Sequence, residues 1–151
     1  MDNVLEYLEQ HREEMLEDLK TLVLAESPTR SKERVDQCGA EIQRLFKKHL
    51  HLDSEVIPQK HAGNHLRFSY GTGDEQILIL GHFDTVWDVG RLSYRVEGNR
   101  AYGPGILDMK GESSKLYGRL KPAASSRFPS ISESFSYARA MKRLEAVRPA
   151  T

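Results

Sequence analysis

The sequence predicts an α/β fold, in which helices pack on a mixed sheet, followed by a C-terminal segment that is helical or disordered. Two observations lead to this prediction. Hydrophobic residues recur at helical spacing through the first part of the chain and then change to short strand-like runs, one of them continuously apolar. The composition also changes near Gly111, where a basic, Ser-rich segment begins. Helices that precede and separate strands, around one buried central strand, indicate a layered α/β domain.

Two amphipathic helices are expected ahead of the strands. Apolar residues between positions 4 and 23 alternate with charged residues at helical spacing, which predicts a single helix of about six turns that ends near Ser27 and Pro28. Ser31 begins the second helix. Cys38 lies close to the apolar face of that helix, so we expect it to be a core residue rather than a nucleophile.

Strand-bearing runs are expected after residue 52. HLRFSY alternates apolar and polar residues and fits a half-buried strand, whereas QILILGHFD is continuously apolar before it turns polar and fits a central strand buried on both faces. SYRVEGNRAYG is typical of two short strands around a Gly-Asn turn. If the C-terminal segment folds, SISESFSYARAMKRLEAV is the expected helix. The strand-bearing runs are 54–58, 65–70, 76–84 and 93–103.

The totals for the chain limit its class and compartment. Lys plus Arg and Asp plus Glu both number 22 among 151 residues, so the net charge indicates no acidic or basic partner. A single cysteine rules out a disulfide framework within the chain and fits a reducing compartment. The acidic N-terminus is unlike a signal peptide, and no apolar run reaches the roughly 18 residues of a membrane span. We therefore expect a cytoplasmic protein.

Three polar residues form the candidate metal site. His82 and Asp84 lie at the carboxyl end of the apolar run, where ligands gather in α/β sheets, and both project to the same side of an extended strand. A carboxylate beside a metal-bound imidazole orients the ring. Asp108 follows a Gly-Pro-Gly loop, 26 residues after His82, and its two oxygens could bridge two cations. His and Asp together suit zinc or a similar divalent ion.

Each of these signals has a structural alternative. A His-x-Asp pair at a strand end is more often structural than a metal site, and a lone Asp after such a loop is more often a turn or helix-cap residue. The combination of GHFDTVW with YGPGILDMKG favours the metal site. The remaining histidines occur in polar or irregular stretches and are expected to be solvated; they are His11, His49, His51, His61 and His65.

On these two motifs, and on LKTLVLAESPTRSKERVDQCG before them, residues 1–111 resemble the di-zinc peptidases and deacylases. That family includes glutamate carboxypeptidase, acetylornithine deacetylase, succinyl-diaminopimelate desuccinylase and aminoacylase. ILILGHFDTVW is most similar to the glutamate carboxypeptidase branch, with Asp88 in place of the usual Pro. The resemblance implies the N-terminal portion of a zinc-peptidase catalytic domain. In that domain His82 ligates one zinc, Asp108 bridges two, and Asp84 supports His82.

The resemblance also implies a metallopeptidase or amidohydrolase reaction. Two metal ions, zinc with cobalt or manganese as alternatives, activate a bridging water while a Glu acts as general base. The substrate would be a small peptide or an N-acyl amino acid, and the product an amino acid such as glutamate. Members of the family form homodimers through a separate domain, which this sequence lacks.

Beyond Gly111 the resemblance stops. The family has five metal ligands and a catalytic base, and this chain matches two of the ligands, His82 and Asp108. The base and the next ligand form a Glu pair, which residues 137–147 do not contain. We therefore expect a partial catalytic domain at residues 1–111, a basic tail at 112–151, and a truncated chain that is catalytically incomplete.

A shift of reading frame would account for the tail. Joining the third base of each codon to the first two bases of the next allows GG(I/V)VQAL(W/R)ALKA from Gly111 onward, an apolar helix like that of the family. The same frame allows DEE(V/I)G(S/G), in which the codons of Met141 and Lys142 force the first Glu, 34 residues after Asp108. The family's Glu pair belongs at that distance. We therefore expect a one-base loss near Gly111, with the tail translated out of frame.

Two other interpretations remain open. The chain could be a related deacylase or desuccinylase subunit that another chain completes by supplying the Glu pair. It could instead be a non-catalytic binding protein whose tail, with 8 basic and 3 acidic residues, binds nucleic acid or an acidic partner. The prolines and scarce aromatic residues of the tail argue against nucleic acid, and we expect neither nucleic-acid nor membrane binding.

Overall fold

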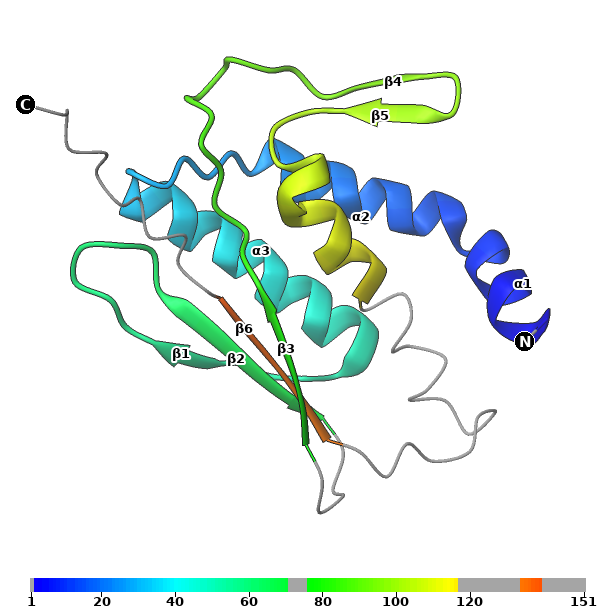
Figure 1. The fold of residues 1–151 in the computed structure, drawn as a ribbon, viewed down its shortest axis with the longest axis horizontal. Coiled ribbons are helices and arrows are strands. Elements are labelled where there is room, and N and C mark those ends of the chain that lie inside the picture. The colour runs from blue at the N-terminus through cyan, green and yellow to red at the C-terminus, as the bar shows by residue number, and fades with distance from the viewer. Residues whose placement is uncertain (1, 71–75, 117–133, 140–151) are drawn as a thin grey trace, which may run out of the picture.

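A computed structural model describes residues 2–70, 76–116 and 134–139 of the chain, and the architecture below refers to those residues. Helices pack on a mixed sheet, and a two-stranded hairpin lies beyond the strand ends (Figure 1). This confirms the expected α/β fold. The helices are α1 (Asp2–Gln10), α2 (Arg12–Leu24) and α3 (Lys32–Leu50). The strands are β1 (Glu55–Ile57), β2 (His65–Tyr70), β3 (Gln76–Gly81), β4 (Arg95–Glu97), β5 (Arg100–Tyr102) and β6 (Ser134–Arg139).

The first helical region is interrupted at His11, so the prediction of one continuous helix was wrong at that residue. The His11 ring turns back toward the preceding turn, where Nδ1 lies 2.8 Å from the main-chain oxygen of Tyr7 and the two rings stack at 4.0 Å. A side chain that inserts at a helical carbonyl kinks the helix there. No helix in the described part of the chain is long and apolar enough to cross a membrane.

The four-stranded sheet has the order β1-β2-β6-β3. β6 pairs antiparallel with β2 and parallel with β3, so it fills the slot between them. The helix expected over residues 130–147 is therefore wrong for Ser134–Arg139. The backbone N–H and C=O groups of β2 and β3 need hydrogen-bond partners, and β6 supplies them. The alternation of Phe135 and Tyr137 with small or polar residues also suits a strand. The rest of that expected helix lies outside the described residues.

The hydrophobic core lies between the sheet and the helices α2 and α3. Phe46 of α3 stacks on Phe68 of β2 with ring centroids 3.9 Å apart, and both side chains are fully buried. Cys38 is also fully buried in this core, which confirms the prediction of a core residue. The buried members of the cluster are Leu22, Val35, Cys38, Ile42, Leu45, Phe46, Leu50, Leu66, Phe68 and Phe83.

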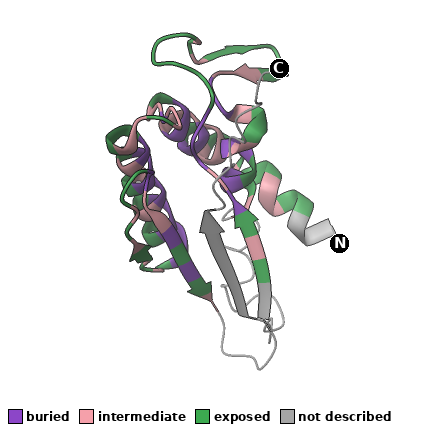
Figure 2. Cartoon of the chain, turned by 60° about the vertical axis from the view of Figure 1, so that its left-hand side comes forward, coloured by how far each residue is buried: buried purple, intermediate pink, exposed green. Residues whose placement is uncertain are grey.

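Strand β3 is less covered than its sequence suggested. Ile79 packs against the core, whereas Leu78 and Leu80, on the opposite face of the strand, are 61% and 54% exposed (Figure 2). Among the described residues β3 is the last strand of the sheet, and its outer face is exposed. The expectation that this strand is buried on both faces is therefore wrong, because helices cover only one of them.

We expect Phe46→Ala to lower the free energy of unfolding by about 3–5 kcal/mol, since it removes a buried ring and leaves a cavity. The control is Leu24→Ala, which truncates a side chain that is 61% exposed and should change stability by less than about 0.5 kcal/mol. Urea unfolding followed by circular dichroism gives both values. Equal losses in the two variants would contradict this assignment of the core.

Candidate metal centre

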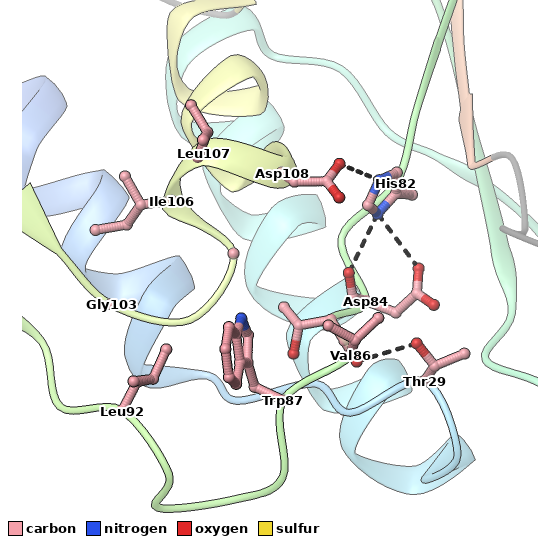
Figure 3. Close-up of a pocket in the computed structure, with 12 residues that line it drawn as sticks. Thr29, His82, Asp84, Val86, Trp87, Leu92, Gly103, Ile106, Leu107 and Asp108 are labelled. Atoms are coloured by element: carbon pink, nitrogen blue, oxygen red, sulfur yellow. Dashed lines mark hydrogen bonds and ion pairs between the residues drawn. The ribbon is translucent and has the colours of Figure 1, made fainter.

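The three candidate residues meet in one cavity at the carboxyl end of β3. The cavity has a volume of about 400 Å³ and lies between the strand end and the loop before Asp108 (Figure 3). His82 and Asp84 enter it from the strand side, and Asp108 enters from the loop side. The structure thus brings together residues that are 26 positions apart in the sequence.

His82 is oriented from both of its ring nitrogens. Nδ1 lies 3.1 Å from the main-chain oxygen of Asp84, an atom that can only accept a hydrogen bond, so Nδ1 carries a proton. The buried Asp84 carboxylate lies 3.6 Å from the same nitrogen. Nε2 faces the opposite way and lies 2.9 Å from Oδ1 of Asp108. The main-chain oxygen of Asp84 thus orients the ring, as a hydrogen-bond acceptor beside a metal-bound histidine does. Nε2 and Oδ1 of Asp108 need either a proton or a metal ion between them at this distance.

Asp108 lies in the turn η1 (Ile106–Lys110), which is closed by backbone hydrogen bonds. The N–H of Lys110 donates to the oxygen of Gly105 at 2.7 Å, and the N–H of Gly111 donates to the oxygen of Ile106. Gly105 has a φ of 79°, and a Cβ there would meet Cγ2 of Thr85 at 2.7 Å. The Gly-Pro-Gly loop can therefore approach the strand end closely only because it carries a glycine at this position.

The strand end is held by the turn that follows α2. Ser27 Oγ donates to the oxygen of Phe83 at 2.5 Å, and the N–H of Thr85 donates to the oxygen of Ser27 at 2.8 Å. The N–H of Thr29 then donates to the oxygen of Thr85, also at 2.8 Å. The Thr29 hydroxyl donates to the same oxygen at 3.0 Å. Four hydrogen bonds thus join the turn after α2 to the backbone on either side of Asp84, and they restrain the direction in which His82 points.

A lysine lies fully buried beneath the site. Lys110 has no exposed surface, and its Nζ donates to main-chain oxygens at the end of α2. Burial lowers the pKa of this ammonium, while the nearby Cys38, Glu26 and Asp84 groups oppose that shift. Burial also raises the pKa of the Cys38 thiol, so Cys38 remains a neutral core group.

One wall of the cavity is apolar, which the sequence pattern alone did not predict. Trp87 faces the cavity together with Val86 and Leu92, opposite Ile106 and Leu107 (Figure 3). Trp87 is the only tryptophan of the chain. The pattern TVW directly after the His-x-Asp pair was a usable signal, because residues that follow a ligand-bearing strand end line the same cavity.

A second group of potential metal ligands lies between α2 and α3. The ligand atoms of Glu14, Asp18 and His49 lie within 4.8 Å of one another. His49 is buried, with Nε2 2.6 Å from Asp18, so the expectation of a solvated His49 was wrong. The last turn of α3 faces α2, which buries this ring. Lys48 Nζ lies 3.3 Å from Asp18 and 3.4 Å from Glu14 and supplies positive charge, so we interpret the group as an interhelical ion-pair cluster.

The donor atoms of the first site fit a divalent metal ion. His82 Nε2 and Asp108 Oδ1 are 2.9 Å apart, and two ligands of a tetrahedral zinc are separated by roughly 3.3 Å. The Asp108 side chain is 63% exposed and has room to make that adjustment. Among the described residues that line this cavity, His82, Asp84 and Asp108 are the only side chains of the His, Cys, Asp or Glu type.

Comparison with known proteins finds curated relatives that are named as peptidases or hydrolases. No protein-family model matches the sequence. Carboxypeptidase G2 of a Pseudomonas strain is 33% identical over 115 residues, which cover 71% of this chain and 27% of that protein. A Pyrococcus abyssi protein named as a LysW-lysine/LysW-ornithine hydrolase is 27% identical over 91% of this chain and 38% of its own length.

Solved M20 and other peptidase structures share the fold. An M20 family metallo-carboxypeptidase of Sulfolobus solfataricus superposes with a TM-score of 0.73 at 17% identity, over 85% of this chain and 30% of that one. Human carnosine dipeptidase 1 superposes with a TM-score of 0.72 at 16% identity, over 97% of this chain and 36% of that one. The chain spans between 14% and 38% of the length of the curated relatives that it matches.

We expect Gly105→Ala to destabilise the protein by more than about 2 kcal/mol, because it adds a clash with Thr85 to the cost of a positive φ. Gly90→Ala is the matched control, since Gly90 has a φ of 73° but nothing within 4 Å of a Cβ. The control should lose only the conformational term, about 1–2 kcal/mol. Urea unfolding separates the two, and an equal loss would contradict the close approach of the loop.

Proposed function

We propose that the chain forms the N-terminal part of a zinc-dependent metallopeptidase or amidohydrolase domain. In this proposal His82 and Asp108 are metal ligands and Asp84 orients His82. The observation that supports it best is the convergence of His82 Nε2 and Asp108 Oδ1 at 2.9 Å from segments distant in sequence. The relatives, among them a carboxypeptidase, support a peptide-bond or related amide hydrolysis.

The residues of the chain would hold the metal ions and shape the cavity for the substrate. A bound zinc pair, for which cobalt or manganese could substitute, would polarise the amide carbonyl and activate a water. Asp84 would keep the proton on His82 Nδ1, so that Nε2 stays free as a ligand. Asp108 would contribute a carboxylate with two oxygens. The wall around Trp87 would contact an apolar part of the substrate.

The substrate class follows from the relatives rather than from the cavity. We propose a small peptide or an N-acyl amino acid, cleaved at an amide bond to release an amino acid such as glutamate. Carboxypeptidase G2 is the relative that suggests the carboxypeptidase version of this reaction. The homodimer that is typical of the family would need a domain outside the residues that match here.

We propose that the chain is catalytically incomplete on its own. It offers two of the family's metal ligands, and residues 137–147 contain no Glu pair that could supply a base. It also spans little more than a quarter of carboxypeptidase G2. In an assay of dipeptides and N-acyl amino acids with added zinc, we expect no turnover above that of a His82→Ala variant. Turnover that His82→Ala abolishes would contradict this.

We also propose that residues from Glu112 onward are translated out of frame. A short helical segment over residues 111–116 buries Ser113 and Ser114, which are 1% and 3% exposed. Ser114 lines an apolar groove of about 380 Å³ along α1 and α2, and its hydroxyl donates to the oxygen of Met15 at 3.1 Å. The alternative frame allows Ile or Val at position 113 and Val at 114, which are residues suited to these buried positions.

A shift of frame would change the side chains after Gly111, whereas the backbone there still follows the fold of the solved peptidases. The superposition with human carnosine dipeptidase 1 covers 97% of the chain and so extends past Gly111, and β6 forms between β2 and β3. The nucleotide sequence decides the question. We expect codons at positions 112–122 that can be read as the apolar helix after one base is restored. Codons that cannot be read in this way would refute the proposal.

We expect zinc or cobalt to bind the isolated chain weakly at His82 and Asp108. His82→Ala and Asp108→Asn should each weaken binding by at least about tenfold, whereas His61→Ala, a change at an exposed histidine, should not. Quenching of the fluorescence of Trp87 by cobalt reports on this cavity, because Trp87 lines it and is the only tryptophan. Binding that is unaffected by His82→Ala and Asp108→Asn would exclude this site.

We expect Ser114→Val to raise the free energy of unfolding by about 0.5–1.5 kcal/mol. The added methyl groups fill the apolar groove at about 0.8 kcal/mol each, and the loss of one hydrogen bond to Met15 offsets part of the gain. Arg34→Val places the same residue at an exposed position of α3, away from this groove, and should be within about 0.5 kcal/mol of the parent. Urea unfolding of both variants measures the difference, and a destabilised Ser114→Val would contradict the argument.

A second candidate is supported by the exposed face of β3. Leu78 and Leu80 form an uncovered apolar stripe on the last described strand of the sheet. Another polypeptide that carries the Glu pair could cover that stripe and complete a deacylase or desuccinylase. Co-purification of such a chain, lost in a Leu78→Lys variant, would favour this candidate over the frame shift.

A further inference from the structure

Lys110 has no assigned role in the function proposed above. Its Nζ donates to the main-chain oxygens of Leu22 at 2.8 Å and Ala25 at 2.9 Å, and the side chain is fully buried. These carbonyls belong to the last turn of α2, where a helix leaves oxygens without intrahelical partners and its dipole favours a cation. Lys110 therefore caps α2, although it comes from a loop 88 positions away from Leu22.

The stem of this lysine is enclosed by the loop that carries Asp108. A Cβ on Gly105 would lie 3.3 Å from Cδ and 3.4 Å from Cγ of Lys110, so the stem passes directly beside this glycine. The N–H of Lys110 also donates to the oxygen of Gly105 at 2.7 Å. Lys110 thus closes the loop that begins at Gly105. Because its ammonium group is bound at the end of α2, this residue also fixes the position of the loop backbone.

The end of α2 also leads into the turn that holds the His82 side of the site. Two residues after Ala25, Ser27 bonds to the oxygen of Phe83 and to the N–H of Thr85, at 2.5 Å and 2.8 Å. One short piece of backbone, residues 25–27, is therefore bonded both to the strand end with His82 and to the loop with Asp108. It can set the distance between them.

Asp108 needs such a restraint from its backbone. Its side chain is 63% exposed, whereas the His82 side chain is 16% exposed and is oriented by Asp84. Packing therefore encloses the Asp108 carboxylate less than it encloses the His82 ring, and the conformation of the loop contributes to the direction of the carboxylate. Among the described side chains of that loop, Lys110 is the one that is fully buried.

We propose that Lys110 is a positioning residue, which caps α2 and thereby holds the loop so that the Asp108 carboxylate meets Nε2 of His82. This inference rests on the proposed function of His82 and Asp108 as metal ligands. It concerns the place of the Lys110 nitrogen and its two hydrogen bonds, and it does not require any change in protonation.

The test compares Lys110→Met, which keeps an apolar stem of similar length but removes the ammonium, with Lys115→Met. Lys115 is exposed and forms an ion pair with Glu112 in the same helical segment, residues 111–116. Cobalt binding is followed by the fluorescence of Trp87, on chains whose circular dichroism is native. We expect Lys110→Met to weaken binding by about 10- to 100-fold, as is typical when a partner of a ligand is lost, and Lys115→Met to leave it unchanged.

A combined variant separates positioning from a general effect. In an Asp108→Asn background, Lys110→Met should cause no further loss of cobalt affinity, because the carboxylate that Lys110 positions is already gone. An equal loss in both backgrounds would overturn the proposal. If Lys110→Met does not fold, Lys110→Gln takes its place, since its amide can still donate to one carbonyl. Failure of both variants to fold would also overturn the proposal, because Lys110 would then serve the whole fold.

A metal-free measurement keeps this test separate from the proposed function. In spectra of the chain with ¹⁵N-labelled histidine, the His82 ring signals of Lys110→Met should move to the positions seen in Asp108→Asn. Signals that stay at the parent positions would overturn the positioning role. If His82→Ala leaves cobalt binding by the chain unchanged, the metal-site proposal fails. The His82 ring signals of the metal-free chain still decide whether Lys110 positions Asp108.

Discussion

The hydrogen bonds between the turn after α2 and the end of β3 are the constraint on which the candidate centre depends. Ser27 and Thr29 bond to the backbone on both sides of Asp84, at 2.5–2.8 Å, and thereby join the helical layer to the sheet where β3 ends. Because Ser27, Phe83 and Thr85 are buried, water cannot replace their partners, and a broken bond there would leave an unsatisfied polar group. These bonds restrain the backbone directly after His82 and so restrain the direction of its side chain.

The same junction explains why buried polar residues gather beneath an exposed site. Asp84, Ser27 and Lys110 are each at most 2% exposed, and each has a hydrogen-bond or ion-pair partner. Satisfied polar groups in a low-dielectric interior hold a geometry more rigidly than exposed ones do. The side chain of Asp108 can therefore stay exposed and adjustable, while the backbone beneath it is fixed.

The surfaces left open by the structure agree with the short span of the chain relative to its relatives. Leu78 and Leu80 face outward, and Ser114 only partly fills the groove along α2. The relatives are longer, so their corresponding surfaces have more chain available to cover them. Apolar surface of this kind promotes association, either with a completing segment or with other copies.

Local pattern by itself determined the second helix, the strands β1 to β5, the burial of Cys38 and the pairing of His82 with Asp84. These follow from periodicity and from spacing along one strand, which are properties of neighbouring residues. Tertiary structure decided the rest. Family resemblance implied that Asp108 and His82 share a site, but only the folded chain shows their 2.9 Å contact. Only the folded chain shows, too, that His49 turns inward against Asp18 and that β6 is a strand rather than a helix. Each of these depends on segments distant in sequence, whose hydrogen bonds and packing outweigh local preference.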